Sequence, residues 1–372
     1  MTELEHIPDR EAEQIDHIVE LTREQLKNRY TGKPRFLRGV HPKDHGCVQA
    51  KFMVKECLAD EYRVGVFAEP GRQFDAWIRF SNAAPLVSPD SALSEAGAVG
   101  HGSRGMAVKL TGVSGSRLME DGELTQDFLM INQPVFAFAN VEDYEALSRI
   151  ILEDNENPKR FFAERIRRTP EGKPVMSDPT TQRTVRTAGI IERITNSKPS
   201  AFQPPPLSPL DNAYFGAAPF LFGEDRVMRF SARPVSPVLG DVGEFVKNAN
   251  YLREALHKRL TEGDGSEIQF EFQVQVRSAE SLAGAIDTEI EDACVDWDEE
   301  KHPLVTLARI AIPPQDCTTT ERKELCERLG FSPWHGLLEH RPLGGINRLR
   351  RAVYEASVRA RTASPAYSTA EY

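Results

Sequence analysis

The chain has 372 residues, a formal net charge of −10 and 40% hydrophobic residues, a composition typical of globular proteins. The net negative charge disfavours nucleic acid as a partner, because phosphates bind basic surfaces. No run approaches the roughly 18 apolar residues of a membrane-spanning helix, and the acidic start Met1–His6 lacks the apolar core of a secretion signal, so we expect no membrane span and a cytoplasmic location.

The cysteines give no sign of a disulfide framework or of a zinc site. Five are present, with no Cys-x-x-Cys pair and no metal-ligand spacing to the nine histidines. An odd, scattered set fits a reducing compartment, where a buried thiol serves as a small core side chain. The five are Cys47, Cys57, Cys294, Cys317 and Cys326.

An amphipathic helix opens the chain, and strands follow it. Asp9–Arg29 sets apolar residues among charges, which predicts an arm packed on the body or on a partner subunit, so a homodimer is one option. The segment Ile268–Val276 alternates strictly and predicts a strand with one buried face. Eight such candidates fit a closed antiparallel barrel. They are Cys47–Lys55, Tyr62–Ala68, Phe74–Ser81, Gly105–Leu110, Phe128–Asn132, Val227–Pro234, Ile268–Arg277 and Leu304–Ile312.

Helical patterns interrupt the strands and end the chain. Because the strands are not contiguous in the sequence, we expect barrel and helices to form one α+β domain over residues 31–362, preceded by the arm at 1–30 and followed by a frayed tail at 363–372. Two irregular links, Glu171–Pro179 and Lys198–Pro209, separate helices. The predicted helices are Val141–Glu153, Pro158–Arg168, Thr180–Ser197, Val242–Thr261 and the whole part from Thr319 onward.

The first polar cluster, Arg38–Cys47, leads into the first strand. Loops that enter a barrel often carry functional groups. His41 offers an imidazole whose pKa lies near neutrality, which suits proton transfer. His45 could turn inward instead, and both are equally consistent with ordinary loop histidines.

Two later strand ends also carry polar side chains. Arg79 and Ser81 share one face of their strand, because successive side chains alternate. Arg79 would need an anion if buried, but it could also extend to solvent. Asn132 ends an apolar strand, and a buried amide requires a hydrogen-bond partner from a nearby turn or from a ligand.

Near the end of the chain, Asn347–Arg361 holds good helix formers without Gly or Pro. Helical geometry places Arg350 and Tyr354 on one face, with Arg361 two turns further along. A phenol keeps its proton to a pKa of about 10, but a contacting ferric ion and a guanidinium both favour the phenolate. Taken alone, this pair is equally typical of a solvated helix face.

In this order, the motifs resemble those of the haem catalases, and specifically of their short catalase-related members. The resemblance extends from residue 38 to residue 361, and its specificity comes from the order of short fragments. The family fold is an eight-stranded antiparallel β-barrel wrapped by helices, in agreement with the strand count. The fragments are Arg38-x-x-His41-x-Lys43, Arg79-Phe80-Ser81, Arg104-Gly105-x-Ala107-Val108-Lys109, Asn132-x-Pro134-x-Phe136 and Arg350-x-x-x-Tyr354.

The resemblance implies haem b bound through Tyr354 as the ligand of the iron. Arg350 is similar to the arginine that keeps this tyrosine ionised. Three further arginines resemble those that pair with the haem propionates: Arg38, Arg79 and Arg361.

On the distal side, the resemblance makes His41 the acid–base group, Ser81 the hydroxyl that orients its ring, and Asn132 the amide that holds the peroxide. Val40 resembles the valine that narrows this side. The chain departs from larger catalases, which have Asn-Asn-Thr-Pro where Asn132 lies one residue nearer to its proline. It also lacks their Pro-Asp after the tyrosine and their C-terminal extension, so NADPH binding is not expected.

The expected function is a haem-dependent peroxidase or catalase-related enzyme that reduces hydrogen peroxide or an organic hydroperoxide. The second substrate stays open and is either another hydrogen peroxide or an organic electron donor. One alternative is a fatty-acid hydroperoxide isomerase or dehydratase similar to allene oxide synthases, which carry threonine in place of Val40. The other is a non-enzymatic haem carrier or sensor, which would keep Tyr354 and the arginines without needing His41 and Asn132.

Overall fold

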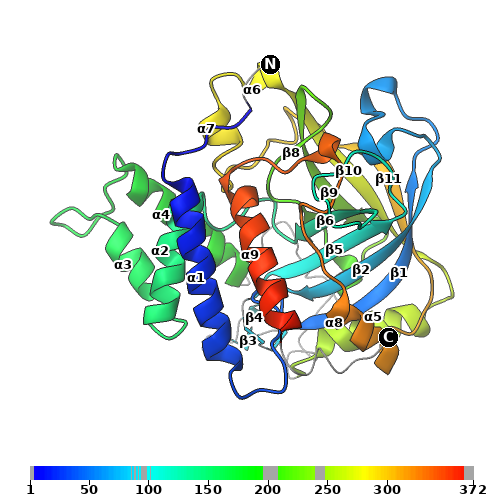
Figure 1. Cartoon of the computed structure of the whole chain (residues 1–372), viewed down its shortest axis with the longest axis horizontal. Coiled ribbons are helices and arrows are strands. Elements are labelled where there is room, and N and C mark those ends of the chain that lie inside the picture. Colours follow the sequence, from blue (N-terminus) through cyan, green and yellow to red (C-terminus); the bar gives the residue numbers. More distant parts are fainter. Residues whose placement is uncertain are drawn as a thin grey trace.

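The computed structural model describes residues 4–84, 86–87, 89–90, 92–93, 99–100, 102–195, 208–238 and 248–363. Eight antiparallel strands close into a barrel, in which the last strand pairs with the first (Figure 1). The predicted α+β barrel is confirmed. In order around the ring, the strands are β1 (Asp44–Val54), β2 (Gln73–Asn82), β5 (Arg104–Thr111), β6 (Thr125–Ile131), β7 (Tyr214–Phe215), β9 (Arg226–Pro234), β10 (Ile268–Ser278) and β11 (Val305–Ile312).

One of the eight predicted strands is wrong. Tyr62–Ala68 instead forms parts of two 3₁₀ turns, Asp60–Tyr62 and Gly65–Phe67. Gly65 has a φ of +54°, which a β-strand does not allow. The ring is completed by β7, whose two residues are too few to leave a periodic signal in the sequence.

Phenylalanines from several strands fill the barrel interior. The ring centroids of Phe128 and Phe272 lie 4.7 Å apart, and those of Phe128 and Phe230 lie 5.1 Å apart. The strict alternation of β10 buries Phe270, Phe272 and Val274 completely, as the sequence predicted. Such close aromatic packing fills the core and contributes to its stability. The barrel interior is therefore filled, and the cavity described below lies against the outer wall of the barrel.

Most predicted helices are present, with some changes of extent. The helix Val141–Glu153 has the predicted bounds, whereas residues 242–247 of a predicted helix lie outside the described residues. So do residues 198–207 of a predicted link and the tail from 364. The part from Thr319 onward is not wholly helical, because residues 329–344 contain only a 3₁₀ turn, Leu338–His340. The helices not yet given are α2 (Val141–Glu153), α3 (Lys159–Arg165), α4 (Pro179–Thr195), α5 (Tyr251–Thr261), α6 (Ala279–Leu282), α7 (Ile286–Glu289) and α8 (Thr320–Arg328).

Short elements complete the description. Strands β3 (Ala92–Leu93) and β4 (Val99–Gly100) pair with each other, and β8 (Phe220–Leu221) pairs with β9 outside the ring. A further 3₁₀ turn spans Pro209–Asp211. Within the described residues, no helix has the length and apolar content required to cross a membrane.

The first and last helices pack side by side between the barrel and the α2–α4 group (Figure 1). These are α1 (Glu11–Tyr30) and α9 (Gly345–Thr362). Ile18 of α1, Val141 of α2 and Leu349 of α9 form one buried cluster. The predicted N-terminal arm therefore packs on the body of its own chain, and a homodimer stays a prediction.

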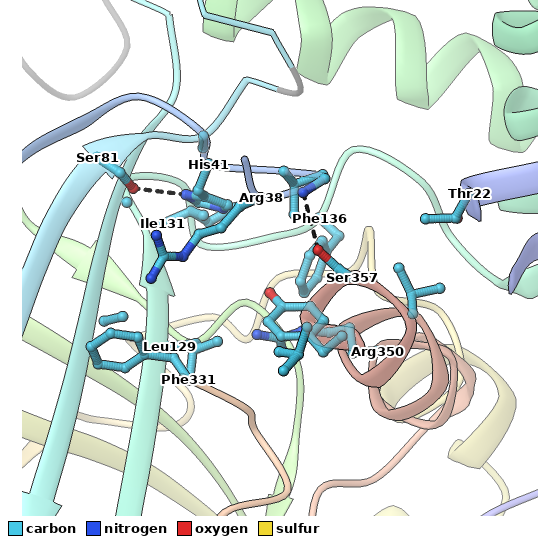
Figure 2. A pocket seen from close by; sticks show the side chains of 18 of the residues that line it. Thr22, Arg38, His41, Ser81, Leu129, Ile131, Phe136, Phe331, Arg350 and Ser357 are labelled. Carbon is cyan, nitrogen blue, oxygen red and sulfur yellow. Dashed lines mark hydrogen bonds between the residues drawn. The ribbon is translucent and has the colours of Figure 1, made fainter. Parts of the chain in front are cut away.

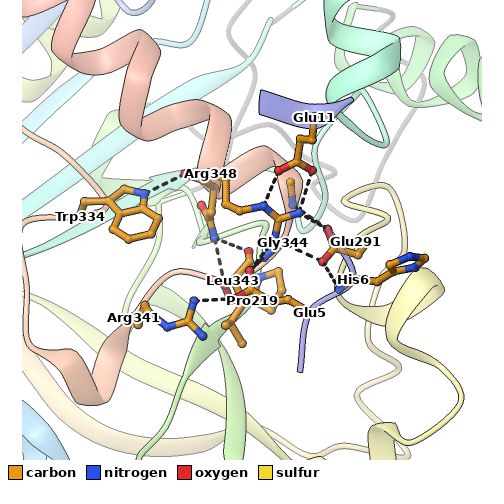
Figure 3. A network of polar contacts seen from close by, with 12 residues as sticks. Glu5, His6, Glu11, Pro219, Glu291, Trp334, Arg341, Leu343, Gly344 and Arg348 are labelled. Atoms are coloured by element: carbon orange, nitrogen blue, oxygen red, sulfur yellow. Dashed lines mark hydrogen bonds and ion pairs between the residues drawn. The ribbon is translucent and has the colours of Figure 1, made fainter. Parts of the chain in front are cut away.

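A buried ion-pair cluster fixes the start of α9 (Figure 3). The Arg348 guanidinium pairs with Glu5 before α1, with Glu11 of α1 at 2.8 Å and with Glu291 after α7 at 2.9 Å. Glu5 and Glu291 also accept hydrogen bonds from the amides of Gly344 and Gly345, at 3.0 and 2.8 Å. These carboxylates satisfy free N–H groups at the positive end of the helix. The N-terminal stretch and the segment after α7, both distant in sequence, are thereby tied to the base of α9.

We expect Arg348→Ala to lower the free energy of unfolding by about 3 kcal/mol or more, because removal of one partner leaves buried charges unpaired. Urea denaturation of the purified variant measures this. Arg359→Ala is the matched control on the same helix, since the Arg359 side chain is 73% exposed in its pair with Glu355, and its stability should stay near wild type. Equal stability of Arg348→Ala and Arg359→Ala would contradict the assignment.

Candidate active site

A cavity of about 350 Å³ lies between the outer wall of β2, β5 and β6 and the helices α1, α2 and α9. This volume is in the range of small-molecule sites. Figure 2 shows His41 and Ser81 on the barrel side, facing Arg350 and Ser357 on α9. Eight of the nine predicted site residues line the cavity: Arg38, Val40, His41, Arg79, Ser81, Arg350, Tyr354 and Arg361.

The His41 side chain is held in an unusual backbone conformation. Its φ is +57°, which is uncommon for a residue other than glycine and tends to occur at functional sites. The His41 carbonyl accepts a hydrogen bond from Arg79 Nη2 at 2.9 Å, and its amide donates to the Ala84 carbonyl at 3.2 Å. These contacts hold the loop so that the ring reaches the cavity.

The ring itself is positioned by Ser81 and Gly105. His41 Nδ1 lies 2.9 Å from Ser81 Oγ. A Cβ atom on Gly105 would lie 2.5 Å from His41 Nδ1 and 2.8 Å from Ser81 Oγ, distances that are too short for any side chain. With Nδ1 engaged by Ser81, Nε2 is the nitrogen left for a ligand.

The imidazole is neutral at ordinary pH. Burial, together with the nearby positive charges of Arg79, Arg350 and Arg38, lowers the pKa of His41 to about 3. His41 is therefore an uncharged hydrogen-bond acceptor at Nε2, and its pKa lies well below the near-neutral value expected from the sequence.

Three arginines line the same cavity. Arg38 donates to the carbonyls of Cys326 and Leu329, both at 2.8 Å, and pairs with Glu327 at 3.3 Å. Burial, together with the positive charges of Arg79 and Arg361, lowers the pKa of Arg38 to about 9. The three guanidinium groups are therefore close enough to repel one another. Arg79 Nε is buried and has no hydrogen-bond partner among the residues that the structure describes. An acidic ligand would satisfy such an atom.

Across the cavity, Arg350 lies against the Tyr354 ring, with 5.5 Å between its Cζ and the ring centroid, and at 5.4 Å from the Phe136 ring. Its Nη1 donates to Asn347 Oδ1 at 3.0 Å, which fixes the guanidinium. The arrangement places a cation on the face of a phenol. Within the described residues, no group of three or more His, Cys, Asp or Glu could hold a metal ion, so the metal prediction depends on Tyr354 alone.

No family model matches this sequence, and no curated protein matches it. Solved structures do match. A bacterial catalase aligns over 93% of this chain with a TM-score of 0.60 and 16% identity, and a fungal catalase over 92% with 0.61 and 16%. Catalase A from Saccharomyces cerevisiae aligns over 91% with 0.59 and 14%. The fold is that of the catalases. The alignments cover 62%, 62% and 65% of those longer chains.

In this catalase fold, Asn132 does not line the cavity. It follows β6 directly, and its Oδ1 accepts hydrogen bonds from the Arg104 amide at 2.7 Å and from Ser103 Oγ at 3.3 Å. The amide therefore joins the end of β6 to the start of β5. Asn132 was predicted to hold a peroxide; it is not among the residues that line the cavity, and this role stays a prediction.

His45 lies outside the cavity as well. Its side chain is buried, and Nε2 lies 3.0 Å from Asn82 Oδ1, in a network that also includes Asp90. The loop thus directs His41 to the cavity and His45 to the protein interior. The residues alone left this choice open, whereas the resemblance to catalases implied that His41 is the one that faces the cavity.

Gly105 is the site residue whose role sequence reasoning missed. It stands in the Arg104-Gly105 fragment, but a glycine near a strand end has many explanations. Only the folded structure places its Cα against the His41 ring. Tyr144 of α2 was also missed; it lines the cavity, and burial raises its pKa, with a further contribution from Tyr354.

We expect Gly105→Ala to lower the free energy of unfolding by about 1–3 kcal/mol, as overpacked sites do. The same substitution in a His41→Ala background should lower the free energy of unfolding clearly less, because the imidazole atoms nearest to the added Cβ are then absent. Urea denaturation of the four proteins in this double-mutant cycle measures the difference. Gly189→Ala is the control, since no atom would lie within 4 Å of its added Cβ. Equal costs in both backgrounds would contradict the contact between Gly105 and His41.

Proposed function

We propose that the protein is a haem-dependent enzyme that reduces peroxides. One observation carries the proposal: a phenol with a guanidinium on its face, a neutral buried imidazole and a group of arginines lie around a single cavity. These side chains come from segments more than 300 residues apart, in a chain with the catalase fold. The similarity to solved catalase structures supports the fold alone. The proposed chemistry is inferred from the side chains around the cavity.

The residues around the cavity fit a haem in composition. The arginines Arg38, Arg79 and Arg361 could meet the two propionates, and Arg79 Nε is a buried donor that lacks an acceptor. Apolar side chains, among them Val40, Met130, Ile131, Phe136 and Phe138, would contact the macrocycle. Tyr354 would ligate the iron as a phenolate, with Arg350 favouring the ionised form. When bound, haem would supply the redox-active iron needed to cleave the peroxide O–O bond.

His41 would handle the proton. As a neutral base it could take the proton of an incoming peroxide at Nε2 and return it to the departing oxygen, a contribution of about 10²–10⁴-fold. Ser81 would keep the ring in place through Nδ1, and Arg79 would hold the His41 carbonyl. A haem carrier or sensor has no use for an imidazole held this way, so the strained His41 favours an enzyme.

Within this function, we propose an organic hydroperoxide as the preferred substrate, with a separate molecule as the reductant. Away from the arginines and Ser81 near His41, the walls of the cavity are largely apolar. An alkyl substituent would gain from burial against these walls. A hydroperoxide isomerase would use the same contacts, and the product distinguishes it because isomerisation consumes no reductant.

Tyr354→Phe tests the proposed iron ligand. Wild-type protein reconstituted with haem should show the charge-transfer absorption bands of a phenolate-ligated ferric haem, and Tyr354→Phe should lose them. Tyr144→Phe is the matched control, because this tyrosine also lines the cavity, and it should keep the bands. If Tyr354→Phe keeps the charge-transfer absorption bands of the wild-type protein, Tyr354 is excluded as the iron ligand.

The ratio of kcat/KM for cumene hydroperoxide to that for hydrogen peroxide tests the proposed substrate. Burial of ~100 Å² of apolar substrate surface is worth roughly 2.5 kcal/mol, so we expect a ratio well above one and only weak oxygen release from hydrogen peroxide. A ratio well below one with vigorous oxygen evolution would identify a true catalase instead.

A further inference from the structure

The C-terminal end of α1 contributes one charged side chain to the wall of the cavity. Arg29 lines the cavity, and its side chain is 10% exposed. Its Nη1 donates a hydrogen bond to the Gly39 carbonyl at 3.0 Å, while Nε and Nη2 donate to the two carboxylate oxygens of Glu156 at 2.7 and 2.8 Å. Arg29 therefore joins the loop that leads to His41 to the turn that follows α2.

The turn that carries Glu156 has an uncommon backbone conformation. Asn155 and Glu156 have φ values of +51° and +68°, in the left-handed region that residues other than glycine rarely adopt, and glutamate less readily than asparagine. The Glu156 amide donates to the Ile151 carbonyl at 2.8 Å, so the turn closes back on α2. Strained residues of this kind persist where their surroundings hold them, and they cluster at functional sites. Here the strained turn places a carboxylate on the Arg29 guanidinium.

Gly39 is held on both of its peptide groups. Its carbonyl accepts the hydrogen bond from Arg29, and its amide donates to Ser357 Oγ at 3.1 Å (Figure 2). Ser357 lies on α9 and also lines the cavity. Two residues further along the loop, Arg79 binds the His41 carbonyl. The backbone that leads to the imidazole is thus fixed by side chains from α1, α9 and β2.

The two arginines that hold this loop differ in what they offer to a ligand. Arg79 has a buried Nε with no hydrogen-bond partner among the described residues, whereas Nε, Nη1 and Nη2 of Arg29 all donate within the chain. The Glu156 carboxylate also balances the charge of Arg29. An anion in the cavity is therefore expected to bind Arg79 rather than Arg29, and Arg29 is placed to act through the loop.

We propose that Arg29 and Glu156 are positioning residues for His41, which fix the loop Arg38–His41 so that the imidazole stays against Ser81 and faces α9. The inference rests on the proposed function for the part that His41 plays in the reaction. It makes α1 a part of the active site, whereas the sequence predicted this helix only as an arm packed on the body or on a partner subunit.

NMR of the full-length, haem-free protein, with histidine labelled at its ring nitrogens, tests the position of the ring. The shifts of Nδ1 and Nε2 show which nitrogen carries the proton. We expect one fixed tautomer of His41 in the wild type and a mixture of both in Arg29→Ala, because the Gly39 carbonyl has then lost its donor. His41→Ala and His45→Ala assign the two signals among the nine histidines. Arg23→Ala is the matched control, an exposed arginine of the same helix, and should keep the wild-type signals.

The His45 ring, which Asn82 holds in the protein interior, should keep one tautomer in every variant that retains it. A fixed His41 tautomer in Arg29→Ala would overturn the proposal. Mixed tautomers at both His41 and His45 would also overturn it, because they would show a general loosening of the fold. If Arg29→Ala does not fold, Glu156→Gln replaces it: loss of the charge weakens the hydrogen bonds from Arg29, so the His41 signals should move in the same direction, and unchanged signals would refute the proposal.

Kinetics after reconstitution with haem separate this inference from the proposed function. Arg29→Ala should bind as much haem as the wild type, and its kcat for cumene hydroperoxide should fall about 10-fold or more with a nearly unchanged KM, because a misplaced catalytic group costs up to about 10²-fold. Loss of haem, or a change in KM alone, would identify Arg29 as a ligand-binding residue instead. Wild-type turnover with a His41 signal that ignores Arg29→Ala would refute this inference alone. A His41 signal that responds to Arg29→Ala, in a protein without haem binding or turnover, would refute the proposed function alone.

Discussion

The site depends on the buried ion pairs that fix the N-terminal end of α9. Arg348 binds three carboxylates from two segments, the N-terminal stretch with Glu5 and Glu11 and the segment with Glu291, and two of these carboxylates also bind amides at the start of the helix. A buried cluster of this kind is costly to break, because each partner left alone would be an uncompensated charge. The helix therefore starts at one defined place and angle. Along its length the helix then presents Arg350, Tyr354 and Arg361 to the cavity.

On the side of the cavity opposite α9, the position of the His41 ring is determined by steric constraints. The His41 ring fits only because residue 105 has no side chain, and its backbone keeps a positive φ because Arg79 and Ala84 bind both of its peptide groups. Arg79 also lines the cavity. One guanidinium thus supports the proposed base and faces the space of the proposed cofactor.

The same electrostatic field has two effects in this cavity. Arg38, Arg79 and Arg350, together with burial, keep His41 neutral, because a further positive charge among them is unfavourable. For the same reason the cavity favours an anionic ligand, since Arg79 has a buried donor without an acceptor. The arginines would bind the propionate carboxylates of a haem, and the neutral His41 would accept the proton of a peroxide. The cavity provides both groups side by side.

The sequence predicted the parts of the fold that have a regular period. The alternation of β10 and the extent of α2 were predicted correctly, because each buries one regular face. Tyr62–Ala68 is as apolar as a strand, but Gly65 turns the chain, and the two-residue strand β7 has no period to detect. Of the site residues that the short motifs predicted, all but Asn132 line the cavity, but most of the other lining residues carry no motif. The motifs could not predict that Asn132 binds the Arg104 amide or that Gly105 faces His41, because both depend on how β5 and β6 pair.

The most direct measurement is a crystal structure of the protein after reconstitution with haem. We expect the haem between His41 and α9, with the Tyr354 oxygen on the iron and the propionates directed to Arg38, Arg79 and Arg361. A haem bound elsewhere, or held by a ligand other than Tyr354, would contradict the proposed site. A cavity that stays closed to haem would contradict the proposed function altogether.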